Sequence, residues 1–259
     1  MVAIQRLLEA SETDAAVREE ADALESRYGH LEPELIIELA IDGFFPEQIA
    51  VVSSFGADSA VLLHLISEID RTLPVIFLDT GKHFSESLDY RDSLVEAFAL
   101  RDLRVIAPDK KQLNRQDADG TLHRRDPDAC CALRKVEPMR RAVEPFKAWF
   151  TGRKRFQAAG RHRMPTFEAV DTRIRINPLA RWTPADIASY ASVHGLLSHP
   201  LVARGYLSIG CMPCTSPVQP GQHPRSGRWA GMEKTECGIH FGPSGEIVRN
   251  TATGAFGDG

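Results

Sequence analysis

The chain has 259 residues, of which 43% are hydrophobic and 25% are charged, and its formal net charge is -4. This is an ordinary globular composition, and the length suits one large domain or two small ones. The negative net charge argues against a nucleic-acid binder that relies on bulk positive charge, and the sequence has no run of 18 or more apolar residues that could span a membrane.

Residues 1–20 have neither a cationic start nor an uninterrupted apolar stretch, so we expect no signal peptide and a cytoplasmic location. In a reducing cytosol, clustered cysteines serve metal binding or catalysis more often than disulfides. From the net charge and the lack of a long apolar run, we expect no nucleic-acid or membrane partner. The sequence leaves the oligomeric state open, a homo-oligomer included.

The first half of the chain alternates between helical and strand patterns. Two amphipathic helices are predicted first, over residues 3–26 and 33–44. Short apolar runs then predict three buried strands, each separated from the next by a helical pattern, at residues 49–55, 73–80 and 103–108. This alternation indicates βαβ units on a parallel sheet, whose ligand sites lie at the carboxyl ends of the strands.

The second half begins with a polar segment, residues 109–129, that is predicted to be a loop. The elements expected after it are a helix over 130–146, strands over 147–152 and 172–179, and a helix that Thr183 caps and Pro184 begins. From His199 onward no periodicity remains. The predicted organisation is N-terminal helices packed on the main domain, an α/β nucleotide-binding domain and an irregular, mobile C-terminal tail, over residues 1–45, 46–198 and 199–259.

The loop after the first strand, "SSFGADS" from Ser53 to Ser59, leads into a helix. Backbone N–H groups at such a helix start can bind an anion. The loop lacks the Gly-Lys-Ser/Thr of a Walker A motif, but it resembles the PP-loop of adenine-nucleotide α-hydrolases, Ser-Gly-Gly-x-Asp-Ser. Phe55 replaces the first glycine, and a bulky residue there argues for an anion other than pyrophosphate. The alternative is a strand–turn–helix without a ligand.

Four of the five cysteines form two pairs, Cys130 with Cys131 and Cys211 with Cys214. Four thiolates can bind one zinc ion or one iron–sulfur cluster. Adjacent side chains diverge, so a tandem pair suits the spread corners of a [4Fe–4S] cluster better than a single zinc ion. Two alternatives stay open: a redox disulfide between Cys211 and Cys214, and buried cysteines with no metal.

The segments "CCALRKVEP", "GYLSIGCMPCT" and "KTECGIH" resemble the three cysteine motifs of the assimilatory sulfonucleotide reductases. In particular, they are similar to those of the adenylyl-sulfate reductases that carry an iron–sulfur cluster. "SSFGADSAVLLHL" and "LDTGKHFSESLDY" resemble the nucleotide site of the same family. The resemblance implies a PP-loop fold, a [4Fe–4S] cluster on the four paired cysteines and adenylyl sulfate as substrate. Phosphoadenylyl sulfate, or both nucleotides, is the alternative substrate.

The resemblance also implies a mechanism. Cys237 would attack the sulfate sulfur, AMP would leave, and an S-sulfocysteine would remain on the enzyme. A thioredoxin or glutaredoxin-like donor would then release sulfite by thiol exchange. The cluster would organise the cysteine segments and set the local field. Gly238 and its neighbours would let the tail close over the substrate and open again.

Several residues match the family's substrate contacts. Lys135, Arg225 and Arg228 would bind the sulfate group, because cations offset its charge and arginine binds oxyanions bidentately. His240 is a further candidate contact. The residues matching the adenosine and phosphate pocket are Ser53, Gly56, Leu78 through its backbone, and Gly152. An arginine near the end of "TGRKRFQAAGRHR" is also expected, and Arg161 is preferred to Arg163. For His83 a core or surface role is preferred.

Two other functions are considered. A PP-loop enzyme that thiolates tRNA would be expected to have an intact Ser-Gly-Gly loop and a strongly basic face, and Phe55 and the net charge of -4 disfavour it. A non-catalytic nucleotide-binding module held together by zinc gives no reason for a reactive Cys237. The preferred prediction is therefore a thiol-dependent reductase.

Overall fold

The computed structural model describes residues 2–232 and 234. It contains a six-stranded sheet with the order β3-β2-β1-β4-β6-β5. All neighbouring strands are parallel except β5 and β6. The strands are β1 (Ile49–Val52), β2 (Val75–Leu78), β3 (Leu103–Ile106), β4 (Ala148–Thr151), β5 (Phe167–Val170) and β6 (Arg173–Ile176). The parallel α/β sheet flanked by helices confirms the predicted fold class.

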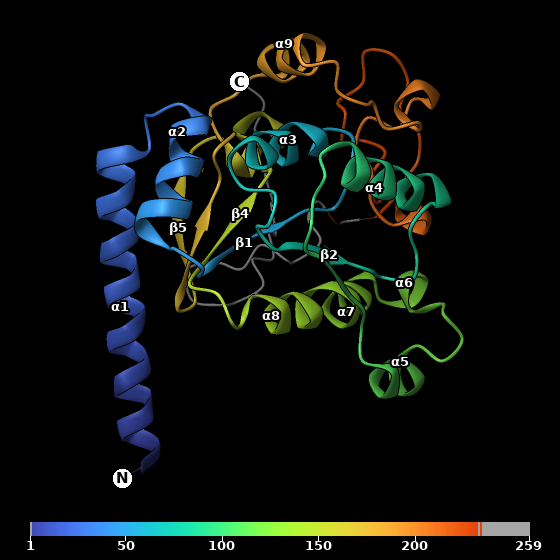
Figure 1. Ribbon diagram of the computed structural model, residues 1–259. Helices are drawn as coiled ribbons and strands as arrows, with labels where there is room; N and C mark the ends of the chain where they lie inside the picture. Colours follow the sequence, from blue (N-terminus) through green and yellow to red (C-terminus); the bar gives the residue numbers. More distant parts are fainter. Residues whose placement is uncertain (1, 233, 235–259) are drawn as a thin grey trace, which may run out of the picture.

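Both faces of the central strands are buried, which explains their continuous apolar sequences. Because successive side chains point to opposite faces, Val51 and Phe77 join the larger core, while Ala50 and Ile76 join a second one. Helices cover the first face and include α2 (Pro33–Glu38), α3 (Ser59–Ile69) and α9 (Pro184–Val193). The second face packs against α8 (Glu137–Val143), which lies on the opposite side of the sheet in Figure 1.

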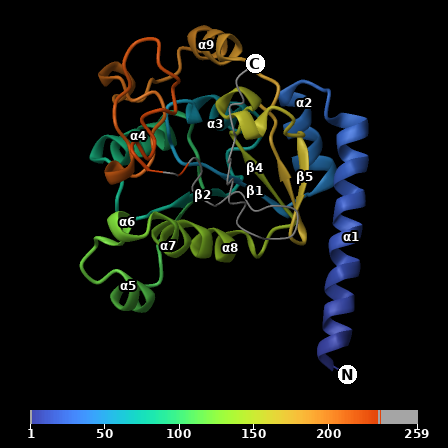
Figure 2. The ribbon, with the colours of Figure 1, turned by 180° about the vertical axis from the view of Figure 1, so that it is seen from behind.

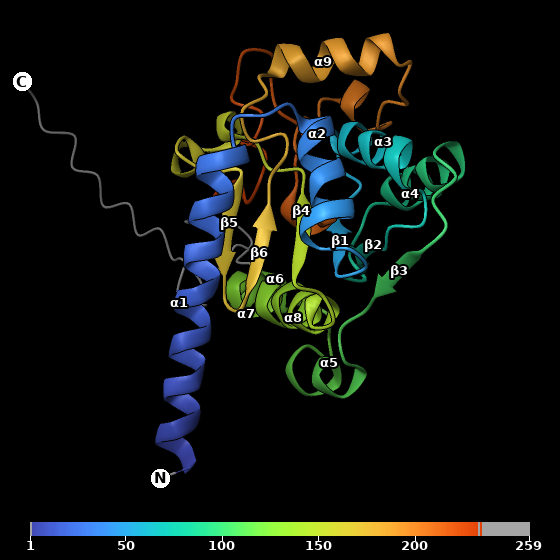
Figure 3. The same ribbon diagram turned by 60° about the vertical axis from the view of Figure 1, so that its left-hand side comes forward.

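The long helix α1 (Val2–Tyr28) lies along the β5 edge of the sheet. Figure 3 shows its N-terminal part extending beyond the other elements. Near its end, the Glu25 carboxylate accepts hydrogen bonds from the backbone N–H groups of Thr166 and Phe167, at 2.8 and 2.9 Å. The helix therefore satisfies backbone donors at the start of the edge strand, which would otherwise need another partner.

The opposite edge carries β3, and the short helices that follow it lie away from α1 in the reverse view of Figure 2. Residues 109–129, predicted as a loop, contain α5 (Lys110–Gln116) and α6 (Leu122–Arg125), and α7 (Pro127–Cys131) begins there. Aspartates explain two of these starts, since Asp109 caps α5 and Asp126 caps α7. The sequence analysis also missed β5, the one antiparallel strand, and made most strands longer than they are.

Within the described part of residues 199–259, the chain forms 3₁₀ turns and loops but no α-helix, as expected. Buried His199 attaches this segment to α4 (Ser85–Ala97). Its Nε2 lies 3.0 Å from Ser87 Oγ, and its Nδ1 accepts a hydrogen bond from the backbone N–H of Leu201 at 3.2 Å. The ring is therefore neutral, with its proton on Nε2. Among the described residues, no helix meets the length and apolarity needed to cross a bilayer.

The state of His199 predicts a loss of stability in acid. Burial lowers the pKa of His199 to about 4, below its ordinary value of 6.5. Between these two pH values the unfolded chain binds more protons than the folded one, so the free energy of unfolding should fall as the pH falls. The slope from this residue is at most about 1.4 kcal/mol per pH unit. Urea titrations of His199→Gln should show a shallower pH dependence than the unaltered protein, whereas His162→Gln, at an exposed histidine, should not.

Candidate functional site

The loop between β1 and α3 is held by its own side chains. The backbone N–H of Gly56 donates to Ser59 Oγ at 2.8 Å, and that of Phe55 donates to Ser53 Oγ at 3.2 Å. Two serines of the PP-loop-like motif thus fix the turn that leads into the helix. From β1 the sheet continues to β2 and β3 on one side and to β4 on the other, so the loop after β1 lies at the point where the strand order reverses. Such a switch point is the usual ligand site of open α/β sheets.

Phe55 does not act as the sequence analysis assumed. Its backbone has a φ of 48°, in the left-handed region that glycine adopts at no steric cost. Its side chain is fully buried in the larger core and packs edge-on against Phe77, with ring centroids 5.6 Å apart. The ring is not among the residues that line the cavity, so it gives no steric reason to exclude a pyrophosphate.

A cavity of about 250 Å³ opens at the carboxyl ends of β1, β2 and β4. Its lining comes from the loop after β1, the segment after β2, the turn η2 (Ala132–Val136) with α8, the segment after β4, strand β6 and the C-terminal segment. Eight of the predicted site residues line this cavity: Ser53, Gly56, Leu78, Lys135, Gly152, Arg161, Arg225 and Arg228. Cys237 and His240 lie outside the described residues, and the four paired cysteines do not line the cavity.

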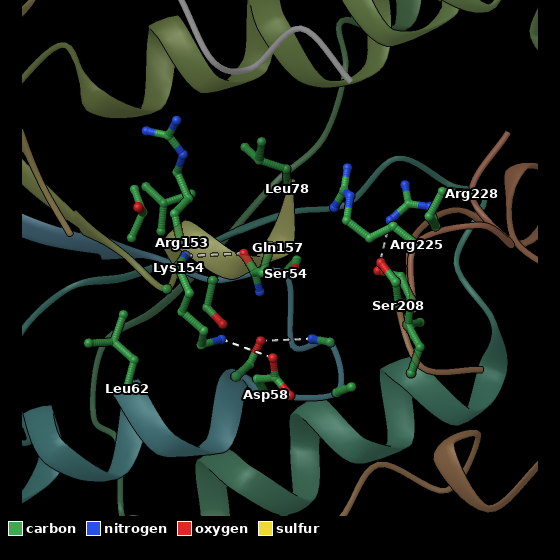
Figure 4. A pocket seen from close by; sticks show the side chains of 18 of the residues that line it. Ser54, Asp58, Leu62, Leu78, Arg153, Lys154, Gln157, Ser208, Arg225 and Arg228 are labelled. Carbon is green, nitrogen blue, oxygen red and sulfur yellow. Dashed lines mark hydrogen bonds and ion pairs between the residues drawn. The ribbon is translucent and has the colours of Figure 1, made fainter. Parts of the chain in front are cut away.

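The charge of the lining is strongly asymmetric. Within residues 2–232 and 234, its lysines and arginines are Lys135, Arg153, Lys154, Arg161, Arg175, Arg225 and Arg228, and its one carboxylate is Asp58. Figure 4 shows Arg153 and Lys154 at one end and Arg225 and Arg228 at the other. A cavity of this charge favours a ligand with separate anionic groups along its length.

At the first end, Lys154 and Asp58 form an ion pair of 3.0 Å. The Lys154 side chain is buried, which lowers its pKa, while the charge of Asp58 opposes this shift. Gln157 Oε1 accepts from the Lys154 backbone N–H at 3.2 Å and from Arg161 Nη1 at 2.9 Å. Arg161 therefore belongs to the cavity wall, whereas Arg163 is exposed and does not line it.

At the other end, backbone pairing positions the two arginines. The Trp229 N–H donates to the Cys214 carbonyl at 3.0 Å, and the Ser216 N–H donates to the Gly227 carbonyl at 2.8 Å. The Arg228 guanidinium lies over the Trp229 ring, 4.4 Å from its centroid, and Nη1 donates to the Ile209 carbonyl at 3.3 Å. A Cβ atom at Gly210 would overlap this guanidinium, so glycine gives Arg228 the space it occupies.

The segment after β2 connects the cavity to the cysteines. Thr80 is buried and lines the cavity, and its Oγ1 lies 3.3 Å from Cys211 Sγ. The Met212 N–H donates to the Lys82 carbonyl at 2.8 Å. His83 also lines the cavity, with Nε2 3.0 Å from the Leu78 carbonyl oxygen. Burial lowers the pKa of His83.

The two cysteine pairs approach each other from different segments. The adjacent residues diverge: Cys130 packs with Leu122 and Leu133, whereas Cys131 packs with Trp229 and Cys214. Burial raises the pKa of the Cys130 thiol, and the charges of Cys211 and Cys214 add to this effect, while Arg134 opposes it. For Cys214, burial likewise raises the pKa, and Lys135, Arg228 and Lys234 lower it.

The structure does not itself assemble a metal site. Among the described residues, no group of three or more histidine, cysteine, aspartate or glutamate side chains is placed to bind a metal ion. The donor types nevertheless fit an iron–sulfur cluster, because Cys131 packs with Cys214, the charges of Cys211 and Cys214 act on Cys130, and cationic side chains lie close enough to act on these thiols.

The sequence analysis missed several residues of the cavity wall. Arg153 and Lys154 fall within the basic run that it noted, but spacing alone does not tell a buried lysine from a solvated one. Thr80 lies within the quoted segment "LDTGKHFSESLDY" but was not singled out there, and Trp229 carries no recognisable signal. Arg175 lies in a predicted strand, and a strand pattern alone does not show which of its side chains face a cavity.

The position of Phe55 predicts a stability effect without a direct effect on the cavity. Phe55→Gly should relieve about 1–2 kcal/mol of left-handed strain but lose about 3–5 kcal/mol of aromatic burial. We expect the free energy of unfolding to fall by about 1–4 kcal/mol, measured by urea denaturation. Affinity for inorganic phosphate should change little in protein that remains folded. The matched variant Phe156→Gly, at an exposed ring, should cost less; equal costs would contradict the assignment.

Comparisons with known proteins agree with this geometry. The chain is 62% identical over 230 residues to an adenosine 5'-phosphosulfate reductase of Mesorhizobium japonicum, covering 89% of this chain and 91% of the relative. An enzyme of the same name from Chelativorans sp. is 59% identical, with coverages of 90% and 95%. The crystal structure of a phosphoadenylyl-sulfate reductase from Candida auris, in complex with phosphate, is 28% identical with a TM-score of 0.65, covering 78% of this chain and 97% of that one.

The phosphoadenosine phosphosulfate reductase domain model matches residues 48–217. This range begins next to β1, contains the whole sheet and continues past both members of the second cysteine pair. The two relatives at 62% and 59% identity are both adenosine 5'-phosphosulfate reductases. The chain therefore belongs to the phosphoadenosine phosphosulfate reductase domain family.

Proposed function

We propose that this protein reduces adenylyl sulfate to sulfite and AMP in assimilatory sulfate reduction. The observation that carries the proposal is that eight residues matched by motif, from segments far apart in the sequence, line one cationic cavity. The relatives named above at 62% and 59% identity support adenylyl sulfate as the substrate. Adenylyl sulfate is an elongated ligand with a phosphate and a sulfate, which suits a cavity with cations at both ends.

The proposed chemistry uses a thiol in two steps. The Cys237 thiolate attacks the sulfate sulfur, a sulfur–sulfur bond forms, and the bond from sulfur to the phosphate oxygen breaks, so AMP leaves with the electron pair. A donor thiolate then attacks Cys237 Sγ and releases sulfite, and the donor's second thiol resolves the mixed disulfide. The two electrons that reduce the sulfur come from the donor's two thiols, which end as a disulfide.

Cations compensate for the repulsion between a thiolate and an anionic substrate. In this proposal Arg225, Arg228 and Lys135 bind the sulfate group and stabilise the charge that moves onto AMP. Ser53, Gly56, Gly152 and the Leu78 backbone bind the nucleotide, together with Arg161. His240 is proposed as a further contact near the sulfate.

The same proposal includes a [4Fe–4S] cluster, which Cys130, Cys131, Cys211 and Cys214 would hold. The packing of Cys131 with Cys214, and the electrostatic influence of Cys211 and Cys214 on Cys130, support it. The cluster would supply a fixed local field and structural order; the substrate's electrons would come from thiols. Lys135 both lines the cavity and lowers the pKa of Cys214, so its charge acts on both sites.

The donor would be a thioredoxin or a glutaredoxin-like protein in the cytoplasm, since such proteins supply the paired thiols that the second step requires. Phosphoadenylyl sulfate is the second candidate substrate. The similarity to a solved phosphoadenylyl-sulfate reductase favours it.

A single-turnover experiment tests the covalent step. When the purified protein is incubated with adenylyl sulfate and no thiol donor, its intact mass should increase by one SO₃ group, because no thiol is present to release sulfite. AMP should appear in equal amount. Cys237→Ser should acquire no added mass, while an added thioredoxin should discharge the label as sulfite.

Two results would contradict the mechanism. One is a label on a residue other than Cys237, located by peptide mapping. The other is stoichiometric AMP release from Cys237→Ser. Arg225→Gln provides a matched control for binding, because it should slow labelling without changing which residue is labelled.

Iron analysis tests the cluster independently of activity. Protein purified without air should contain about four iron and four sulfide per chain and absorb broadly near 400 nm, as expected for a [4Fe–4S] centre. Cys131→Ser should lose most of this iron, since thiolates hold the cluster, whereas Cys237→Ser should retain it. Zinc in place of iron, or equal iron in both variants, would rule the assignment out.

A further inference from the structure

Two arginines in the cavity wall are bound to one carboxylate that lies behind them. Arg153 and Arg175 line the cavity, and Glu168 does not. Arg153 Nη1 donates to Glu168 Oε1 at 2.7 Å, and Arg175 Nη2 donates to Oε2 at 2.7 Å. Arg175 Nε also donates to Oε1, at 3.2 Å, which makes the Arg175 pair bidentate.

The sheet places these three side chains together. Strand β5 runs antiparallel to β6, with Glu168 directly opposite Arg175, and β6 pairs with β4 on its other side. Arg153 follows soon after the end of β4. The carboxylate therefore comes from the outer strand, and both guanidinium groups lie between it and the cavity.

Glu168 is saturated and ionised in this arrangement. Asn177 Nδ2 also donates to its Oε1, and Asn177 Oδ1 accepts from Thr151, the last residue of β4. Burial favours the neutral acid, but Arg175 and Arg153 outweigh it and hold the pKa of Glu168 below its ordinary value. Arg175 depends on Glu168: every hydrogen bond recorded for its guanidinium among the described residues goes to that carboxylate, and Nη1 is buried without a partner.

This cluster lies at the end of the cavity away from Arg225 and Arg228, as the position of Arg153 in Figure 4 shows. In the proposed function that far end receives the nucleoside, because the sulfate group lies between Lys135 and the two C-terminal arginines. A phosphate on the ribose would therefore approach Arg153 and Arg175. It would compete with Glu168 for the same N–H donors.

We propose that Glu168 is a specificity-determining residue that favours nucleotides without a 3'-phosphate by occupying Arg153 and Arg175. The inference rests on the proposed function and deepens it by naming the substrate class. Specificity here is a difference between two affinities. AMP does not need these guanidinium groups, whereas the 3'-phosphate of a bisphosphate would meet two guanidinium groups whose charge is already partly offset by a buried carboxylate.

The test compares AMP with adenosine 3',5'-bisphosphate by isothermal titration calorimetry on the full chain. In Glu168→Gln the neutral amide no longer competes with a phosphate. The affinity for the bisphosphate, relative to that for AMP, should rise by about tenfold. Adding Arg175→Gln to this variant should bring the ratio back to within about threefold of the unaltered protein, because a cation that the 3'-phosphate would reach is then absent.

Glu137→Gln is the matched control, because it removes the same charge and breaks an ion pair with Arg141 on α8, outside the cavity. It should leave the ratio unchanged. Arg153→Gln gives an independent readout should Glu168→Gln fold poorly: the bisphosphate should lose affinity relative to AMP, since the cluster then has no net positive charge.

Three outcomes separate the possibilities. Equal changes for both nucleotides in Glu168→Gln and Arg153→Gln would overturn the inference and leave Glu168 with a structural role only. A shift of the same size in Glu137→Gln would also overturn it, because bulk charge would then be the cause. Absence of AMP binding by the unaltered protein would overturn the proposed function, and the inference with it.

Discussion

The cavity depends on how an irregular C-terminal segment is attached to a regular sheet. Besides the contact of His199 with α4, two backbone hydrogen bonds position this segment: Met212 to Lys82, in the segment after β2, and Trp229 to Cys214, within the C-terminal segment. The first fixes the Cys211 segment at the carboxyl edge of the sheet. The second folds the chain back so that Arg225 and Arg228 reach the same edge. Neither bond involves a side chain, so the arrangement tolerates a sequence with little apolar periodicity.

Acidic side chains form ion pairs with three of the cations that line the cavity. Lys154 has Asp58 as its partner, and Arg153 and Arg175 share Glu168. Buried ion pairs of this kind contribute little net stability, because desolvation offsets most of their attraction, but they fix the orientation of each cation. The loop and strand residues thus present donors in set directions before any ligand arrives, and preorganised donors are those that stabilise charge most effectively.

Much of the fold follows from the sequence because parallel strands buried on both faces leave an unambiguous pattern. The apolar runs at β1 and β2 could hardly be exposed, and Thr183 with Asp186 forms the capping box that starts α9. The sequence did not predict strand β5, because its Phe-Glu-Ala-Val sequence is short and contains Glu168, whose burial depends on two distant arginines. The short helices after Asp109 and Asp126 were also not predicted, because their N-terminal caps define them and their sequences show no helical periodicity.

The residues of the site likewise fall into those that local sequence could predict and those that it could not. Residues within contiguous motifs, such as Gly56 and Lys135, could be selected from local sequence and lie in the cavity. Arg175 could not, since its relation to the cavity arises only when β6 is placed beside β4 and β5 beside β6. Phe55 shows the limit of substitution logic. A large residue at a glycine position suggests a blocked loop, but Phe55 has a left-handed backbone conformation and its ring packs into the core against Phe77. Replacing a glycine that has a positive φ always adds backbone strain. Whether it also blocks the ligand site depends on which side of the turn the new side chain occupies.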